Sequence, residues 1–134
     1  MFYGAILILK VLTMAFLTPL ARFRNGAFAN PEDLTLQDGL KGVKTHDDVE
    51  RIRRAHLNDM ENIYVFLFLG FFYVLTNPDL STATNLFRVF TGARILHSIV
   101  YVNAVRQPAR VLSYAVGTVI NIYMAVTVVL RFMN

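Results

Sequence analysis

The stretch FYGAILILKVLTMAFLTPL, residues 2–20, decides the fold class, because it runs for 19 residues with Lys10 as its one charge. A helix of about 20 apolar residues is long enough to cross the hydrocarbon core of a bilayer. A cleavable leader would carry a charged start and a small-residue cleavage motif, and this stretch has neither. We therefore expect a retained membrane span over residues 2–21.

One long polar loop and three more spans are expected after this stretch. The Asn30-Pro31 turn signal and most of the acidic residues lie in 22–48, which is typical of a loop. Thr45 or Asp47 is expected to cap the second helix, and Ser81 or Thr82 to start the third. The spans should cover 49–75, 82–105 and 109–132, with turns at Thr76-Asn77-Pro78-Asp79 and Gln107-Pro108.

The composition agrees with a membrane protein, since 55% of the residues are hydrophobic, 16% are charged and the mean hydropathy is +0.47. A soluble domain carries nearer a quarter charged residues. The chain has no cysteine, so any sulfur chemistry must come from a bound substrate. We predict a single all-α domain over residues 1–134, an integral membrane four-helix bundle.

The basic residues predict which side of the membrane each loop faces, because Lys and Arg accumulate in cytoplasmic loops. The first loop, the start of the second helix and the last turn hold Arg22, Arg24, Lys41, Lys44, Arg51, Arg53, Arg54, Arg106 and Arg110, whereas the opposite side has little beyond Arg131. Both termini are therefore expected on the lumenal side. Since the positive charge clusters beside apolar runs, the net charge of +4 is explained by topology, and we discount nucleic acid as a partner.

Polar side chains form stripes on three of the predicted helices. At about 100° per residue, each set falls within a sector of about 60°. The sets are Arg54, Asn58 and Glu61; Arg94, His97 and Tyr101; and Arg110, Tyr114, Gly117 and Asn121. Ionisable groups inside spans normally face a bundle interior. The stripes predict a polar cleft that opens on the cytosol.

The predicted cleft holds more cations than anions, which favours an anionic ligand, because arginine presents a fixed fork of donors to carboxylates. Glutathione suits it, with two carboxylates, an ammonium that Glu61 can hold, and a thiol that a nearby guanidinium would activate. The spacing alone does not single out glutathione. No metal site is expected, since His46 and His56 have no matching ligands.

Structural roles for the same residues stay open. Arg54, Asn58 and Glu61 can equally form an ion-pair network, and His97 can donate to a backbone carbonyl. Tyr101 and Tyr114 can be interfacial anchors. Lys10 is expected to snorkel or to pair inside the bundle.

Several long motifs carry a resemblance to a known family. They are FANPED at 28–33, VER at 49–51, RRAHLNDMEN at 53–62 and GAR at 92–94, followed by His97, Tyr101, Gln107-Pro108 and Arg110. Over nearly the whole chain the sequence resembles the MAPEG family, the membrane-associated proteins in eicosanoid and glutathione metabolism. The resemblance implies a four-helix subunit in a homotrimer, with glutathione bound between neighbouring subunits.

The resemblance also implies roles for single residues. The positions that match glutathione contacts are Arg22, Arg54, Asn58, Glu61, His97, Tyr101, Arg110 and Tyr114. Arg110 matches an arginine that stabilises the thiolate, and Asp33 matches an acid that pairs with it. Arg22 and Asp33 are implied by the resemblance alone.

The activity that the resemblance implies is conjugation of glutathione to hydrophobic electrophiles, with peroxidase activity on lipid hydroperoxides as a second reaction. The alternatives are glutathione-dependent isomerisation of a prostaglandin endoperoxide and a non-catalytic membrane scaffold. Leu57 and Val111 depart from an arginine and a serine of the synthase branch, which favours the transferase branch. The expected location is the endoplasmic reticulum or the mitochondrial outer membrane, with the site facing the cytosol.

Overall fold

The first helix extends one turn beyond the span expected from the sequence. The computed structural model describes residues 1–39 and 42–133, so Lys41, which was counted among the cytosolic basic residues, lies outside the described residues. Helix α1 runs from Phe2 to Asn25 and carries Arg22 and Arg24 in its last turn, where cations favour the helix dipole. Gly26 ends the helix in the left-handed conformation, with φ of 57°, which glycine adopts without steric cost.

The stretch expected to be one long loop contains a short helix. The 3₁₀ helix η1 covers Pro31–Leu36, with proline at its start, where a missing backbone N–H costs nothing. Helix α2 then runs from Asp47 to Leu75. The expected caps Thr45 and Asp47 are wrong, because His46 is the N-cap and its Nδ1 accepts from the backbone N–H of Asp48 at 3.2 Å.

The third helix begins earlier than expected. Helix α3 covers Leu80–Val102, and its N-cap is Asp79 rather than Ser81 or Thr82. A carboxylate at this position satisfies free amides of the first turn, and Asp79 accepts from the backbone N–H of Thr82 at 2.8 Å. Helix α4, Ala109–Phe132, has the bounds expected for the fourth span.

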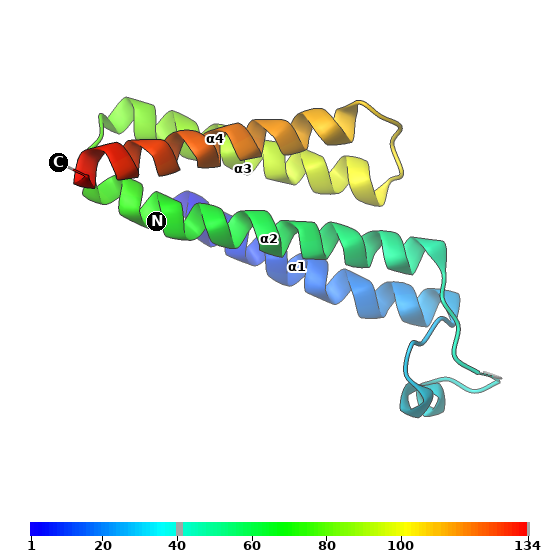
Figure 1. Cartoon of the computed structure of the whole chain (residues 1–134). Helices are drawn as coiled ribbons and strands as arrows, with labels where there is room; N and C mark the ends of the chain where they lie inside the picture. Colours follow the sequence, from blue (N-terminus) through cyan, green and yellow to red (C-terminus); the bar gives the residue numbers. More distant parts are fainter. Residues whose placement is uncertain (40–41, 134) are drawn as a thin grey trace.

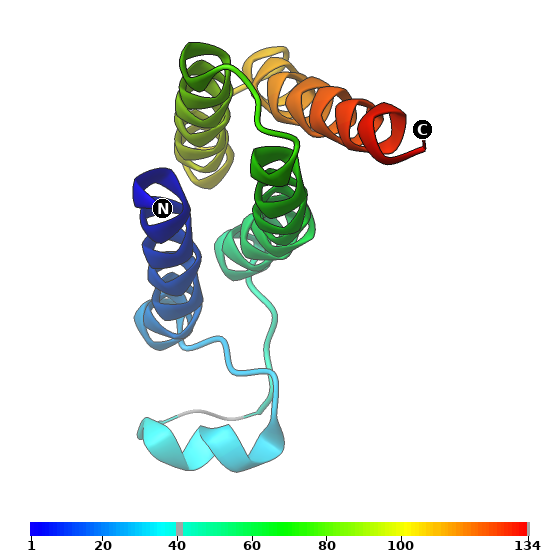
Figure 2. The same ribbon diagram turned by 90° about the vertical axis from the view of Figure 1, so that its left-hand side faces the viewer.

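The four α helices form two pairs, α1 with α2 and α3 with α4, laid side by side (Figure 1). Both termini and the α2–α3 turn lie at one end of the bundle, and the long loop and the α3–α4 turn lie at the other. Within the described residues α1 and α4 do not contact each other, because α2 and α3 lie between them. Helix η1 packs against none of the four and stands apart from the bundle (Figure 2).

The core is apolar and sits toward the end that carries the termini. Phe66 of α2 and Phe90 of α3 stack with ring centroids 3.8 Å apart, among Leu7, Val11, Ile63, Tyr73, Ala83, Ile120 and Met124. Large apolar side chains also cover the outside, such as Phe16, Phe68 and Val119. Such an extensive exposed apolar surface is unfavourable in water and typical of a helix bundle in lipid.

The all-helical class expected from the sequence is confirmed. The described residues contain four α helices and one 3₁₀ helix, and no strand. By length and composition, α1 and α4 are the two described helices apolar enough to cross a membrane. Helices α2 and α3 carry interior charges, and these charges build the polar region described next.

Candidate functional site

A cleft of about 260 Å³ opens between α2, α3 and α4 beside the α3–α4 turn. Five residues that the sequence predicted as ligand contacts line it: Asn58, His97, Tyr101, Arg110 and Tyr114. Gln107 and Val111 complete the lining. The cleft therefore unites residues of all three predicted stripes.

Arg110 is the cation of the cleft. Its guanidinium carbon lies 4.6 Å from the centre of the Tyr101 ring, within the range of a cation–π contact. His97 turns its ring against the same tyrosine, with centroids 5.5 Å apart and planes at 64°. None of the seven lining residues is acidic, so the cation of Arg110 has no carboxylate partner within the cleft.

Beneath the cleft lies a closed cluster, which we define as Lys10, Asp59, Arg94 and Ser98. The side chains of Asp59 and Arg94 are fully buried, and Arg94 Nη2 donates to Asp59 Oδ1 at 2.6 Å. Lys10 pairs with the other carboxylate oxygen, Oδ2, as expected for a lysine paired inside the bundle. Ser98 Oγ also donates to that oxygen, at 2.8 Å, and accepts from Lys10 Nζ at 2.6 Å.

Arg94 connects the closed cluster to the cleft. Its Nη2 donates to Asn58 Oδ1 at 2.8 Å and lies 3.3 Å from His97 Nδ1. The alternative role for His97, a hydrogen bond to a backbone carbonyl, is not found among the described residues. The polar atoms of α2 and α3 thus form one connected system from the bundle centre to the cleft.

Two predicted ligand residues of α2 lie outside the cleft. Arg54 and Glu61 are on the same helix face as Asn58, and both side chains are exposed. Neither forms an ion pair with another described residue, so the alternative of a structural ion-pair network is not observed in this chain. Both charges remain available to a ligand.

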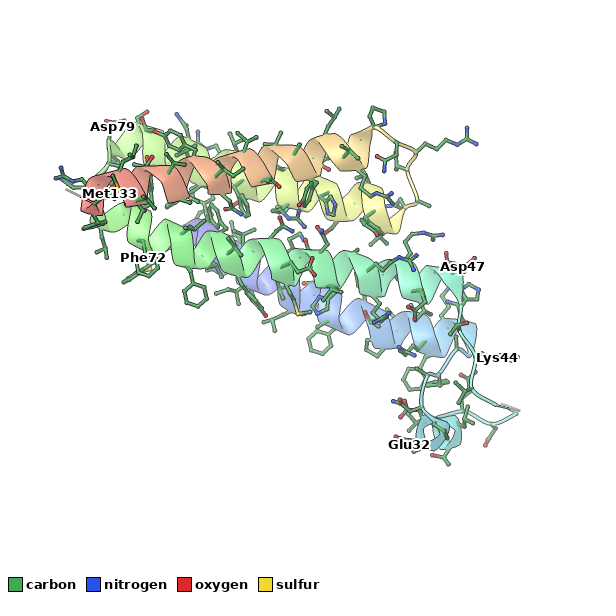
Figure 3. All side chains as sticks on the ribbon, viewed as in Figure 1. Glu32, Lys44, Asp47, Phe72, Asp79 and Met133 are labelled. Atoms are coloured by element: carbon green, nitrogen blue, oxygen red, sulfur yellow. The ribbon has the colours of Figure 1, made fainter. Side chains whose placement is uncertain are left out.

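The remaining two predicted residues, Arg22 and Asp33, lie near the long loop. Arg22 Nη1 donates to the carbonyl oxygen of Ala27 at 3.3 Å and so holds the end of α1. Asp33 lies in η1 and accepts from Asn30 Nδ2 at 3.0 Å. Figure 3 labels Glu32 and Lys44 in this loop, which lies on the α1–α2 side of the bundle. Helix η1 does not contact α4, and no ion pair joins Asp33 and Arg110 within the described part of the chain.

Asp59 was not predicted as an important residue, although its sequence context carries a signal. It lies on the helix face of Ala55, Phe66 and Tyr73, all of which are buried. A carboxylate on an apolar stripe requires a buried cation, and Lys10 in the first span requires an anion. A prediction that paired Asp59 with Lys10 would have located the closed cluster. No group of three potential metal ligands is found among the described residues.

The apolar outer surface, the long helices and the buried charges together define an integral membrane protein of the helix-bundle class. The chain belongs to the MAPEG family, whose model matches residues 1–130. The family assignment agrees with the resemblance seen in the motifs.

Curated relatives cover most of the chain. Microsomal glutathione S-transferase 1 of mouse is 46% identical over 127 residues, which cover 92% of this chain and 82% of the relative. The human protein of the same name is 45% identical with the same coverage. Prostaglandin E synthase of dog is 43% identical over 114 residues, covering 85% of this chain and 74% of the relative.

Proposed function

We propose that this chain is a membrane-bound glutathione transferase that conjugates glutathione to hydrophobic electrophiles. The observation that carries the proposal is Arg110, a cation without a carboxylate partner in a cleft that also holds two phenols, an amide and an imidazole. Such a set of donors suits a thiolate and carboxylates. The names of the mouse and human relatives support the same activity.

In the proposed reaction, Arg110 stabilises the thiolate of glutathione, and the thiol proton leaves to solvent. A guanidinium near sulfur lowers the thiol pKa and raises the fraction of the reactive form. The sulfur then bonds to the electrophilic carbon, and the leaving group departs with its electron pair. The protein contributes electrostatic stabilisation and orientation, so no covalent enzyme intermediate is required.

We further propose a homotrimer in which neighbouring copies complete the site. The cleft of one chain, at about 260 Å³, is below the 300–1,000 Å³ typical of small-molecule sites. Arg22 and Arg54 would hold the carboxylates of glutathione, with His97 or Tyr114, and Glu61 would hold its ammonium. Asp33 would approach Arg110 from a neighbouring copy, since the two are apart within one chain.

The proposed orientation puts the cleft and the long loop on the cytosolic side of the endoplasmic reticulum or the mitochondrial outer membrane, with both termini lumenal. The α3–α4 turn and the long loop lie at the same end of the bundle, as this orientation requires (Figure 1). Hydrophobic electrophiles would enter from the bilayer.

A second reaction and a second candidate follow from the same site. As a peroxidase, the thiolate would attack a lipid hydroperoxide, and two glutathiones would yield an alcohol, water and glutathione disulfide. The 43% identity to the dog synthase favours a glutathione-dependent isomerase as the second candidate. Isomerisation consumes no glutathione, so the amount of glutathione lost per product separates these reactions. A non-catalytic scaffold would bind glutathione without any turnover.

The test is turnover of the purified protein in detergent with glutathione and 1-chloro-2,4-dinitrobenzene. Loss of one electrostatic contact to the reacting atom lowers kcat by about 10²–10³, and we expect that range for Arg110→Ala. The matched control is Arg106→Ala, an exposed arginine at the same turn that lies outside the cleft. Equal activity of the two variants would remove Arg110 from the mechanism, and absence of conjugation by the unmodified chain would favour the isomerase or the scaffold.

A further inference from the structure

Arg94 touches two cleft residues from inside the bundle. Its Nη2 is 2.8 Å from Asn58 Oδ1 and 3.3 Å from His97 Nδ1. The guanidinium itself is completely buried and does not line the cleft. Arg94 therefore contacts the cleft through these two neighbours.

A guanidinium has donors and no acceptor, and this fixes the groups that face it. Asn58 must turn its carbonyl oxygen toward Arg94, so its NH₂ group is on the other side of the amide. Arg94 Nη2 has two N–H groups for three neighbours, Asn58, Asp59 and His97, so its contact with His97 Nδ1 is a shared one. An N–H on Nδ1 would face this cation, and we therefore expect Nδ1 to be unprotonated. The ring is then neutral, and its proton is on Nε2.

Asp59 fixes Arg94 in turn. Its Oδ1 accepts from Arg94 Nη2 at 2.6 Å, while its Oδ2 is held by Lys10 and by Ser98 Oγ. The carboxylate, fully buried, therefore has partners on both oxygens from two other helices. This anchor acts through Nη2, which is held toward Asn58 and His97, whereas Arg94 Nε and Nη1 are buried without a hydrogen-bond partner among the described residues.

We propose that Arg94, anchored by Asp59, is a positioning residue that determines which hydrogen-bonding groups Asn58 and His97 present to the cleft. It makes Asn58 and His97 two neutral donors, which select carboxylate or other acceptor oxygens of the ligand over ammonium groups. The inference rests on the proposed function, since the ligand is taken to be glutathione. It adds a role for the closed cluster, which touches no ligand.

Two substitutions of His97 test the roles of its two ring nitrogens separately. In His97→Gln the side-chain NH₂ reaches the place of Nε2 and still donates into the cleft. In His97→Asn the shorter amide keeps an acceptor near the place of Nδ1, toward Arg94, and places no donor at the position of Nε2. The control is His56→Gln, a histidine of α2 that does not line the cleft.

The measurement is the Kd of glutathione for the detergent-solubilised protein by titration calorimetry. A hydrogen bond to a charged group changes affinity by about tenfold or more, so we expect His97→Asn to weaken binding by about that factor. His97→Gln should stay within a few-fold of the unmodified protein, and His56→Gln should match it. Equal losses in the two His97 variants, or a larger loss in His97→Gln, would overturn the inference.

The histidine tautomer gives a second readout that needs no ligand. Nitrogen-15 NMR of ligand-free protein should show the His97 proton on Nε2. Arg94→Met leaves the Lys10–Asp59 pair intact, and Nδ1–H should then become populated. A His97 proton on Nδ1 in the unmodified protein would contradict the inference, whereas a protein that shows the expected tautomer but binds no glutathione would contradict the proposed function alone.

Discussion

The closed cluster and the cleft are built from the same kinds of side chain but differ in how charge is balanced. In the closed cluster Asp59 is held by Lys10 and Arg94, and all three side chains are mostly or fully buried. In the cleft Arg110 rests on the ring of Tyr101 and no acid is present among the lining residues. The two regions are joined through Asn58 and His97.

This difference separates a structural role from a ligand-binding role more clearly than residue type does. Buried ions are costly unless they are paired and hydrogen-bonded, and in the closed cluster both oxygens of Asp59 and the Nη2 of Arg94 have such partners. A cation without a partner in an accessible cleft is instead available to an anion from outside. The comparison predicts that substitutions in the closed cluster affect stability and that substitutions in the cleft affect activity.

The largest effect is expected for Asp59→Leu, which leaves Lys10 and Arg94 buried without their anion. Breaking a buried ion pair by removing one partner costs about 3–5 kcal/mol. The measurement is the free energy of unfolding in mixed micelles. The control is Glu61→Leu, which removes an exposed carboxylate two residues away on the same helix and should change stability by about 0.5 kcal/mol or less. Similar losses from both variants would erase the distinction between the two regions.

A smaller effect, on the turnover rate, is expected at Tyr101, whose ring is in contact with the guanidinium of Arg110. Tyr101→Phe keeps the ring beneath Arg110, and Tyr101→Leu removes it. A cation–π contact at a partly exposed site is worth about 0.5–1 kcal/mol, so the leucine variant should turn over roughly two- to fivefold more slowly than the phenylalanine variant. Both variants lack the hydroxyl, so the difference between their turnover rates reports the contribution of the ring. Equal rates for the two would mean that the ring does not orient Arg110.

The cleft could be predicted from the sequence because helical periodicity is local. Asn58, His97 and Arg110 each lie on a polar stripe that is visible within its own helix, and the structure brings these stripes together at one end of the bundle. The short helix η1 and the cap at His46 were missed, because weak local signals in a polar loop compete with many alternative turns.

The closed cluster was harder to predict because its partners are distant in the sequence. Lys10 and Asp59 are separated by 49 residues, and Lys10 and Ser98 by 88. Periodicity says which face a residue occupies and does not say which helix packs against that face. Arg22, Arg54, Glu61 and Asp33 remain predictions, since the proposed partner of the first three is bound glutathione and that of Asp33 is Arg110 of another copy of the chain.

The smallest effect is expected at Asp79, which belongs to neither region and measures the contribution of an exposed charge. The hydrogen bonds from the backbone N–H and the hydroxyl of Thr82 hold the pKa of Asp79 below its ordinary value. A carboxyl group whose pKa is lowered by folding stabilises the protein above its unfolded pKa of about 3.9, and this contribution is lost as the pH falls through the lowered value. Asp79→Asn keeps a capping side chain but removes the charge.

The melting temperature of Asp79→Asn in detergent should therefore be slightly lower than that of the unmodified protein at pH 7, and the gap should close on acidification. The other carboxylates titrate in both proteins, so their contributions cancel in the difference. Because Asp79 is fully exposed to solvent, screening weakens its contribution, and the melting temperature should fall much less in Asp79→Asn than in Asp59→Leu. A difference in melting temperature that grows at low pH would contradict the stabilising role of the Asp79 charge. A decrease in melting temperature as large as that of Asp59→Leu would mean that burial is not what distinguishes the closed cluster.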